Sequence, residues 1–135
     1  NLDSMINQLF FFAFVWSVGV TTTLDGRIKF DKWVRETLLA PLGFTFPQEK
    51  LAYDYWFDVE KKDWINWTDT VPAYNVDIKM SYNEILVPTV DSIRMKYFTK
   101  LLVTNGKHAL TPGPTGTGKS VNIAELLTFE LPEEY

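Results

Sequence analysis

The stretch Gly113-Pro114-Thr115-Gly116-Thr117-Gly118-Lys119-Ser120 decides the fold of the residues around it. It matches the pattern G-x-x-x-x-G-K-[ST] at every position. Glycines let such a loop curve around phosphate groups with its N–H groups pointing inward. The lysine of the pattern reaches the β- and γ-phosphates, and the serine hydroxyl ligates Mg²⁺. We therefore predict a phosphate-binding loop in which Lys119 contacts the phosphates and Ser120 holds the metal.

The residues on either side of the loop fit a strand–loop–helix unit. A short strand is predicted at residues 107–111, before the glycine-rich loop, and a helix over residues 119–129 after it. The helix has an apolar face, and its N-terminus directs the positive end of its dipole at the loop. A surface turn rich in glycine, proline and threonine is the alternative, and the two flanking elements disfavour it.

Composition excludes several other kinds of site. The 135 residues are 46% hydrophobic and 22% charged, as in a globular protein. The formal charge is −4 and the 13 basic residues are scattered, which argues against nucleic-acid binding. The chain has no cysteine, and His108 is its one histidine, which excludes disulfides, thiolate zinc sites and multi-histidine metal sites.

The first forty residues are predicted to form two helices. The first covers residues 3–18 and is hydrophobic nearly all round, which is typical of a helix buried against several neighbours. Its most apolar run, Leu9–Val20, is shorter than the roughly 20 residues that span a bilayer, so we expect no membrane contact. The second helix covers residues 27–39, with Asp25 as its N-terminal cap.

An aromatic β-hairpin is predicted over residues 53–67. Two aromatic-rich segments flank Glu60-Lys61-Lys62, and we expect the backbones of Tyr55 and Trp64 to pair. Aromatic cross-strand packing explains this composition, and binding of a sugar or a proline-rich peptide is the weaker alternative. A connector with a short strand at residues 76–78 is expected next.

From Val87 the pattern becomes helical again. Pro88-Thr89 is expected to start a helix and Asn105-Gly106 to end it in a left-handed conformation. The clearest boundary lies near residues 82–87, which divides the chain into regions 1–86 and 87–135.

Binding of a nucleotide does not by itself make an ATPase. Hydrolysis also requires a Walker-B acid on a later strand, a residue that positions water, and usually an arginine finger. The acids after the loop lie on its helix or beyond, where they do not fit the Walker-B role: Glu125, Glu130, Glu133 and Glu134. We therefore expect no hydrolysis by this chain alone and assign no catalytic residue.

Several segments together resemble the dynein heavy chains. Ile85–Ser120, which reads ILVPTVDSIRMKYFTKLLVTNGKHALTPGPTGTGKS, is similar to the beginning of their third AAA+ module. FAFVWSVGVTTTLDGRIKFDKWVRETL is similar to the helical segment that closes the second module, and LAYDYWFDVEKKDWINWTDTVPAY to the aromatic hairpin and connector between modules. The pattern VPT-x-D-[ST]-x-R at Val87–Arg94 and the form GPTGTGKS look most like axonemal chains.

This resemblance implies a fold that mixes α and β structure. Region 1–86 would be a helical lid subdomain with the aromatic hairpin. Region 87–135 would open an AAA+ α/β P-loop domain with a helix, a strand, the P-loop and a second helix. The chain would be a segment of a very large microtubule motor, covering the lid after the second module and the beginning of the third, usually regulatory, module.

The resemblance also implies the ligands, partners and location. ATP or ADP with Mg²⁺ would be held by the loop, with Ser120 on the metal. The residues that would contact the nucleotide are Gly113, Pro114, Thr115, Gly116, Thr117, Gly118, Lys119 and Ser120, with Val87, Pro88 and Thr89 at the adenine. Partners would be the other AAA+ modules of the same chain, microtubules, and dynein intermediate and light chains, in the cytoplasm and the cytoskeleton of a cilium or flagellum axoneme. A structural spacer between modules with a static nucleotide site, and a non-dynein AAA+ ATPase, are the alternatives.

Overall fold

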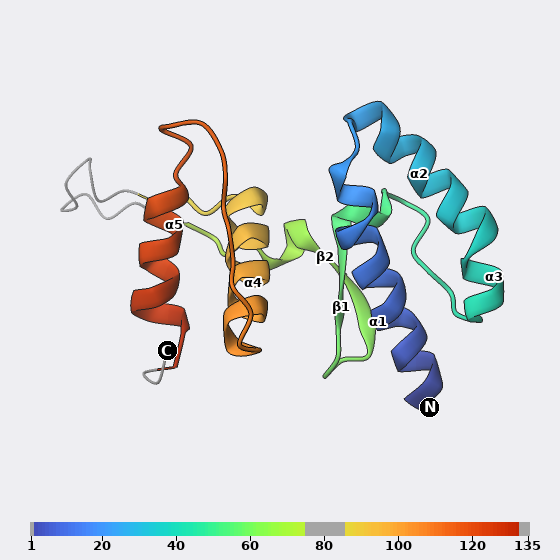
Figure 1. Cartoon of the computed structure of the whole chain (residues 1–135). Helices are drawn as coiled ribbons and strands as arrows, with labels where there is room; N and C mark the ends of the chain where they lie inside the picture. Colours follow the sequence, from blue (N-terminus) through green and yellow to red (C-terminus); the bar gives the residue numbers. More distant parts are fainter. Residues whose placement is uncertain (1, 75–85, 133–135) are drawn as a thin grey trace. The chain divides into compact units, whose positions relative to one another are not determined.

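The structure is a computed structural model that describes residues 2–74 and 86–132. Its contacts divide the chain into two compact units, Asn1–Asp69 and Thr70–Tyr135, and Figure 1 shows the elements of each. This division lies earlier in the chain than the boundary expected between residues 86 and 87. The short strand predicted at residues 76–78 lies outside the described residues.

The first unit begins with three helices. Helix α1 spans Leu2–Ser17, α2 spans Leu24–Thr37 and α3 spans Leu39–Leu42, with a 3-10 turn at Gly19–Thr21 after α1. The expected cap at Asp25 is wrong. Thr23 caps α2 instead, because its hydroxyl accepts a hydrogen bond from the N–H of Gly26 and its backbone is extended, as N-cap residues require.

The predicted hairpin is present as a two-stranded antiparallel sheet of β1, Tyr55–Asp58, and β2, Asp63–Asn66. Its register differs from the expected one, because Tyr55 pairs with Asn66 and Phe57 pairs with Trp64. The turn sets this register. Its N–H groups at Glu60 and Lys61 donate to one carboxylate oxygen of Asp58, at 2.9 and 3.1 Å.

Aromatic rings form the core between α1, the chain after α3, and the hairpin. The ring of Trp64 lies 4.7 Å from that of Phe46, 5.3 Å from that of Phe57 and 5.9 Å from that of Phe11, between centroids. Trp64 is 8% exposed and Trp67 only 1%. Burial to this degree favours the packing interpretation of the hairpin aromatics over a sugar or peptide site.

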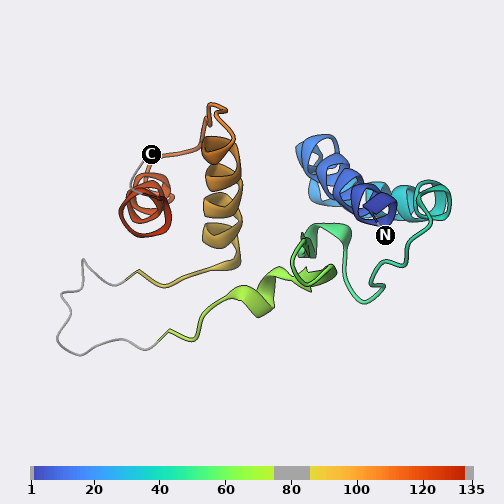
Figure 2. The same ribbon diagram turned by 90° about the horizontal axis from the view of Figure 1, so that it is seen from below.

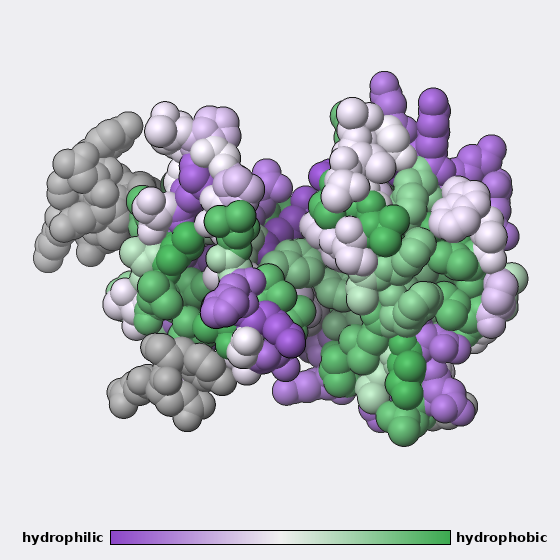
Figure 3. All heavy atoms as spheres, viewed as in Figure 1, coloured by the Kyte–Doolittle hydropathy of each residue, from purple (hydrophilic) through white to green (hydrophobic). Residues whose placement is uncertain are grey.

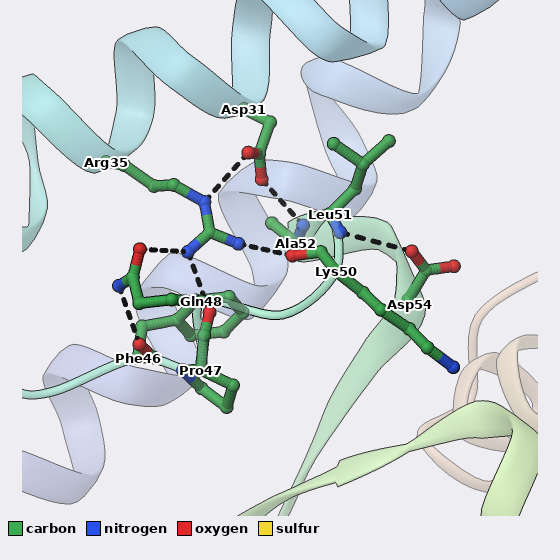
Figure 4. A network of polar contacts seen from close by, with 9 residues as sticks. All are labelled: Asp31, Arg35, Phe46, Pro47, Gln48, Lys50, Leu51, Ala52 and Asp54. Atoms are coloured by element: carbon green, nitrogen blue, oxygen red, sulfur yellow. Dashed lines mark hydrogen bonds and ion pairs between the residues drawn. The ribbon is translucent and has the colours of Figure 1, made fainter.

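A buried ion pair fastens the chain after α3 to α2 (Figure 4). Arg35 Nε donates to Asp31 Oδ2 at 2.8 Å, and the other oxygen of Asp31 accepts from the N–H of Ala52 at 2.7 Å. The Arg35 guanidinium also donates to the carbonyls of Pro47 and Lys50, both at 2.7 Å. One arginine therefore binds two points of a segment that has no regular secondary structure of its own.

The described residues of the first unit bury one side of helix α1 and leave large apolar side chains of another side exposed. Phe11, Phe12 and Val15 are buried, whereas Ile6 and Phe10 are each 52% exposed. Figure 3 shows apolar side chains gathered on the surface of the first unit. By length and composition alone, the stretch Leu2–Thr21 could cross a membrane. It is longer than the apolar run Leu9–Val20 considered in the sequence analysis. Its buried residues belong to the core of the first unit.

The described part of the second unit contains two helices, which lie side by side in Figures 1 and 2. Helix α4 spans Val90–Thr104, and α5 spans Lys119–Glu125 and continues as a π-helical turn over Leu126–Glu130. The expected strand at residues 107–111 is wrong, because this segment has no regular secondary structure and pairs with no strand among the described residues. A strand exists through hydrogen bonds to a neighbour, and the described part of this unit holds no other strand to pair with it.

Candidate functional site

Two glycines give the loop at residues 113–118 its curvature. Gly116 has φ of 77° and Gly118 has φ of 76°, in the left-handed region that side chains disfavour. Gly118 is also the N-cap residue of α5. Of the two glycines that the sequence pattern requires, Gly118 has the left-handed backbone and Gly113 does not, and Gly116 adds a second left-handed position.

The side chain of Lys119 lies across the loop. Its ammonium donates to the carbonyl oxygen of Pro114, and to the hydroxyl of Thr117 at 3.0 Å. A Cβ added to Gly113 would lie 3.4 Å from Cδ and 3.6 Å from Nζ of this lysine. The lysine side chain thus reaches back over the loop to within van der Waals contact of position 113.

Asn122 holds the junction between the loop and α5, and the sequence pattern did not reveal it. Its side-chain amide donates to the carbonyl oxygen of Gly118 at 2.9 Å, and its backbone N–H donates to the same oxygen at 3.0 Å. Asparagine is a poor helix former inside a helix. Its place one turn after the last loop glycine was the signal that could have identified it.

A hollow of about 260 Å³ adjoins the loop. Val87, Pro88 and Thr89, which the family resemblance assigned to an adenine pocket, line it together with Gly118. The other residues that line it are Leu86, Ser92, Val121, Asn122 and Glu125. The α5 members follow Gly118 at helical spacing, so a helical-wheel projection of residues 118–125 would have predicted them.

The cap of α4 fixes the segment beside this hollow. The hydroxyl of Thr89 accepts from the N–H of Ser92 at 3.1 Å, and the N–H of Thr89 donates to the hydroxyl of Ser92 at 2.9 Å. Such a reciprocal cap satisfies two N–H groups at once and sets the angle at which the chain enters the helix. Val87 and Pro88 are thereby held close to the loop.

The residues present fit a magnesium ion only in company with phosphate. Ser120 is exposed at the first turn of α5, next to Lys119. Residues 2–74 and 86–132 contain no group of three His, Cys, Asp or Glu side chains that could hold a metal ion. Mg²⁺ is commonly held by few protein ligands together with substrate phosphates. The hydroxyl of Ser120 fits that pattern.

An ion pair between α4 and the helix after the loop shifts the pKa of Lys96. Burial lowers the pKa of Lys96, but hydrogen bonds to Glu130 and Glu125 outweigh it and raise the pKa above its ordinary value. Lys96 therefore stays charged at any physiological pH.

Comparison with known proteins assigns both parts of the chain. A family model described as "Dynein heavy chain AAA lid domain" matches residues 1–69, and one described as "P-loop containing dynein motor region" matches residues 74–135. Dynein axonemal heavy chain 1 of Mus musculus is 34% identical over 100% of this chain, and that of Homo sapiens is 32% identical over the same share. Dynein axonemal heavy chain 12 of Mus musculus is 32% identical over 93% of this chain.

The chain spans about 4% of the length of these curated relatives. The lid match ends at residue 69, where the first compact unit also ends. The P-loop of the second match contains the glycine turns and the lysine described above. This chain therefore belongs to the dynein heavy chain family and contains residues of its AAA lid domain followed by residues of its P-loop motor region.

Proposed function

We propose that this chain binds ATP or ADP with Mg²⁺ at residues 113–120, as part of the third, regulatory AAA+ module of an axonemal-type dynein heavy chain. One observation supports the nucleotide site above the others: the Lys119 ammonium lies over a loop that turns at two left-handed glycines. The hollow beside Gly118 supplies a place for the base next to Val87 and Pro88. A loop for phosphates and a neighbouring apolar hollow are what a nucleotide requires.

In the proposed complex, a triphosphate competes with the loop for Lys119. The ammonium donates to a neutral carbonyl at Pro114, and a phosphate oxygen is a stronger acceptor because it is charged. The ammonium would exchange Pro114 for the β- and γ-phosphates. Mg²⁺ would take the hydroxyl of Ser120 as a ligand and neutralise further phosphate charge.

The carboxylates of this unit support binding without hydrolysis by this part of the chain. The described residues of the second unit include three acids: Asp91, Glu125 and Glu130. Asp91 lies 3.5 Å from Arg94, and both glutamates bind Lys96. All three are engaged in ion pairs, and hydrolysis would depend on other residues of the parent motor. A static nucleotide site in an inter-module spacer is the second candidate.

The wider function follows from the family and is proposed for the parent protein. A dynein heavy chain of axonemal type would act with its other AAA+ modules on microtubules, in the axoneme of a cilium or flagellum. Dynein intermediate and light chains would be further partners. Within it we propose that residues 1–86 form the lid and inter-module extension, and residues 87–135 the N-terminal part of the large subdomain.

Titration of the full heavy chain with a fluorescent ATP analogue tests the proposal. Lys119→Ala is expected to remove one component of binding, because it removes the cation from the loop. Lys107→Ala is the matched control, since this exposed lysine precedes the loop in the same unit. Loss of the same component in both variants, or in neither, would contradict a nucleotide site at this loop.

A further inference from the structure

Lys96 on α4 joins two carboxylates near the end of the helix that follows the loop. Its Nζ lies 2.6 Å from Oε1 of Glu130 and 3.2 Å from Oε2 of Glu125. The Lys96 side chain is 11% exposed, whereas those of the two glutamates are about one third exposed, at 36% and 35%. We call these three residues the Lys96 clamp. It is a contact between helices, because its members come from α4, from α5 and from the turn after α5.

A change of helix type allows both glutamates to reach one ammonium. In an α-helix, residues five apart point about 140° away from each other, because each residue turns by about 100°. After Glu125 the helix becomes a π-helix, closed by a hydrogen bond of 3.1 Å from the N–H of Leu131 to the carbonyl of Leu126. Bonding from i to i+5 places residues five apart on nearly the same side. The π-helical turn therefore directs Glu130 to the side of Glu125.

The clamp shares a residue with the nucleotide site. Glu125 lines the hollow of about 260 Å³ that also touches Gly118 and Pro88. With Lys96 in place, the Glu125 carboxylate is bound on the α4 side. Without that cation, two neighbouring carboxylates would repel each other. Glu125 would then present an unpaired negative charge to a hollow that lies beside the phosphate loop.

We infer that Lys96 is a positioning residue for the nucleotide site: it binds the carboxylates of Glu125 and Glu130, docks the loop helix on α4, and pairs the Glu125 charge at the wall of the base hollow. The inference rests on the proposed nucleotide binding at the loop. Lys96 acts through Glu125 and contacts no nucleotide. Its effect is expected on nucleotide affinity, because the hollow and the loop both depend on where α5 lies.

The test uses the full heavy chain and the fluorescent ATP analogue. The binding component of this site is defined as the component that Lys119→Ala removes. Lys96→Met keeps the length and apolar stem of the side chain and removes the charge, and we expect it to weaken this component about three- to tenfold. The matched control is Lys100→Met, one turn later on α4, where the lysine is exposed; its affinity is expected to equal that of the wild type.

Rescue separates a charge effect from a loss of packing. The triple variant Lys96→Met, Glu125→Gln, Glu130→Gln has no unpaired carboxylate and is expected to regain affinity to within about twofold of the wild type. Wild-type affinity in Lys96→Met, or a folded triple variant as weak as Lys96→Met, would overturn the inference. If Lys96→Met does not fold, the affinities of the triple variant and of Lys96→Arg test the inference, and weakened nucleotide binding in both variants would overturn it. If Lys119→Ala removes no component, the proposed function fails and this inference with it.

Discussion

Replacement of Asp31 by alanine is expected to destabilise the first unit severely. Asp31 is 7% exposed, and its two oxygens bind Arg35 and the N–H of Ala52, a residue that is itself 2% exposed. Removing one partner of a buried ion pair costs about 3 to 5 kcal/mol. Arg35 keeps the carbonyls of Pro47 and Lys50 as acceptors, so we expect the lower end, about 3 kcal/mol.

That loss is large relative to the whole stability of the unit. Residues 1–69 at ordinary stability per residue would have about 3 to 10 kcal/mol in total. Asp31→Asn keeps an acceptor for the N–H of Ala52 but puts an NH2 group in place of the oxygen that faces Arg35, so it loses the ion pair and its hydrogen bond and is expected to cost about 1 to 2 kcal/mol. The two variants thus separate the hydrogen bond from the ion pair.

Urea unfolding followed by tryptophan fluorescence measures these losses in the first unit specifically. All five tryptophans lie within Asn1–Asp69: Trp16, Trp33, Trp56, Trp64 and Trp67. The control is Lys32→Ala, which breaks an exposed pair with Glu36 at 3.9 Å and is expected to cost at most about 0.5 kcal/mol. An Asp31→Ala variant as stable as Lys32→Ala would refute the conclusion that the Asp31–Arg35 network stabilises the chain after α3 against α2.

Three further outcomes follow from the structure. Trp64→Ala removes the ring at the centre of the aromatic core and is expected to cost about 3 to 5 kcal/mol in the same urea assay, whereas a cost below 1 kcal/mol would contradict its central place. Hydrogen bonds from the N–H groups of Lys61 and Glu60 lower the pKa of Asp58 in the folded state. The Asp58 carboxylate therefore stabilises the hairpin above its unfolded-state pKa, and this stabilisation is lost as the pH falls through its folded-state pKa. Asp58→Asn should remove this part of the pH dependence of unfolding. Gly118→Ala places a side chain at φ of 76° and is expected to weaken analogue binding by the full heavy chain, while Ala124→Gly, on α5 but outside the loop, serves as the comparison.

Local patterns were enough to predict the hairpin but not its register. The recurrence of aromatic residues at every second position, Tyr53, Tyr55 and Phe57, indicates a strand with one buried face, and all three residues are buried. The pairing of Tyr55 with Asn66 depends on the turn, where Lys62 adopts φ of 56°. A lysine gives no sign in sequence that it will take a left-handed conformation, so the turn length was not predictable.

The phosphate loop was predictable because the pattern fixes Gly113, Gly118 and Lys119, and because the further glycine at position 116 also permits a left-handed backbone. Gly116 and Gly118 have the left-handed backbone that their residue type permits, and Lys119 lies over the loop. The strand predicted at residues 107–111 is absent, because a strand forms only where a neighbouring strand pairs with it. The adenine assignment of Val87, Pro88 and Thr89 stays a proposal, supported by the hollow that they line with Gly118.

The Lys96 clamp lay beyond any local pattern. Residues 119–129 have no glycine or proline after the loop, so they predict an uninterrupted α-helix. The π-helical turn at Leu126–Glu130 instead coincides with an ion pair to a lysine on another helix. The turn and the contact occur together, and the local pattern predicts neither.

The reach of Lys119 across the loop affects how fast and how favourably a ligand can bind. A free lysine side chain loses up to about 2 kcal/mol of rotational freedom when it is fixed. Here the chain has already lost much of that freedom to Pro114 and Thr117. Binding of a phosphate would therefore exchange one acceptor for another without ordering the side chain anew, and a substitution such as Thr117→Val would show its cost mainly in the association rate.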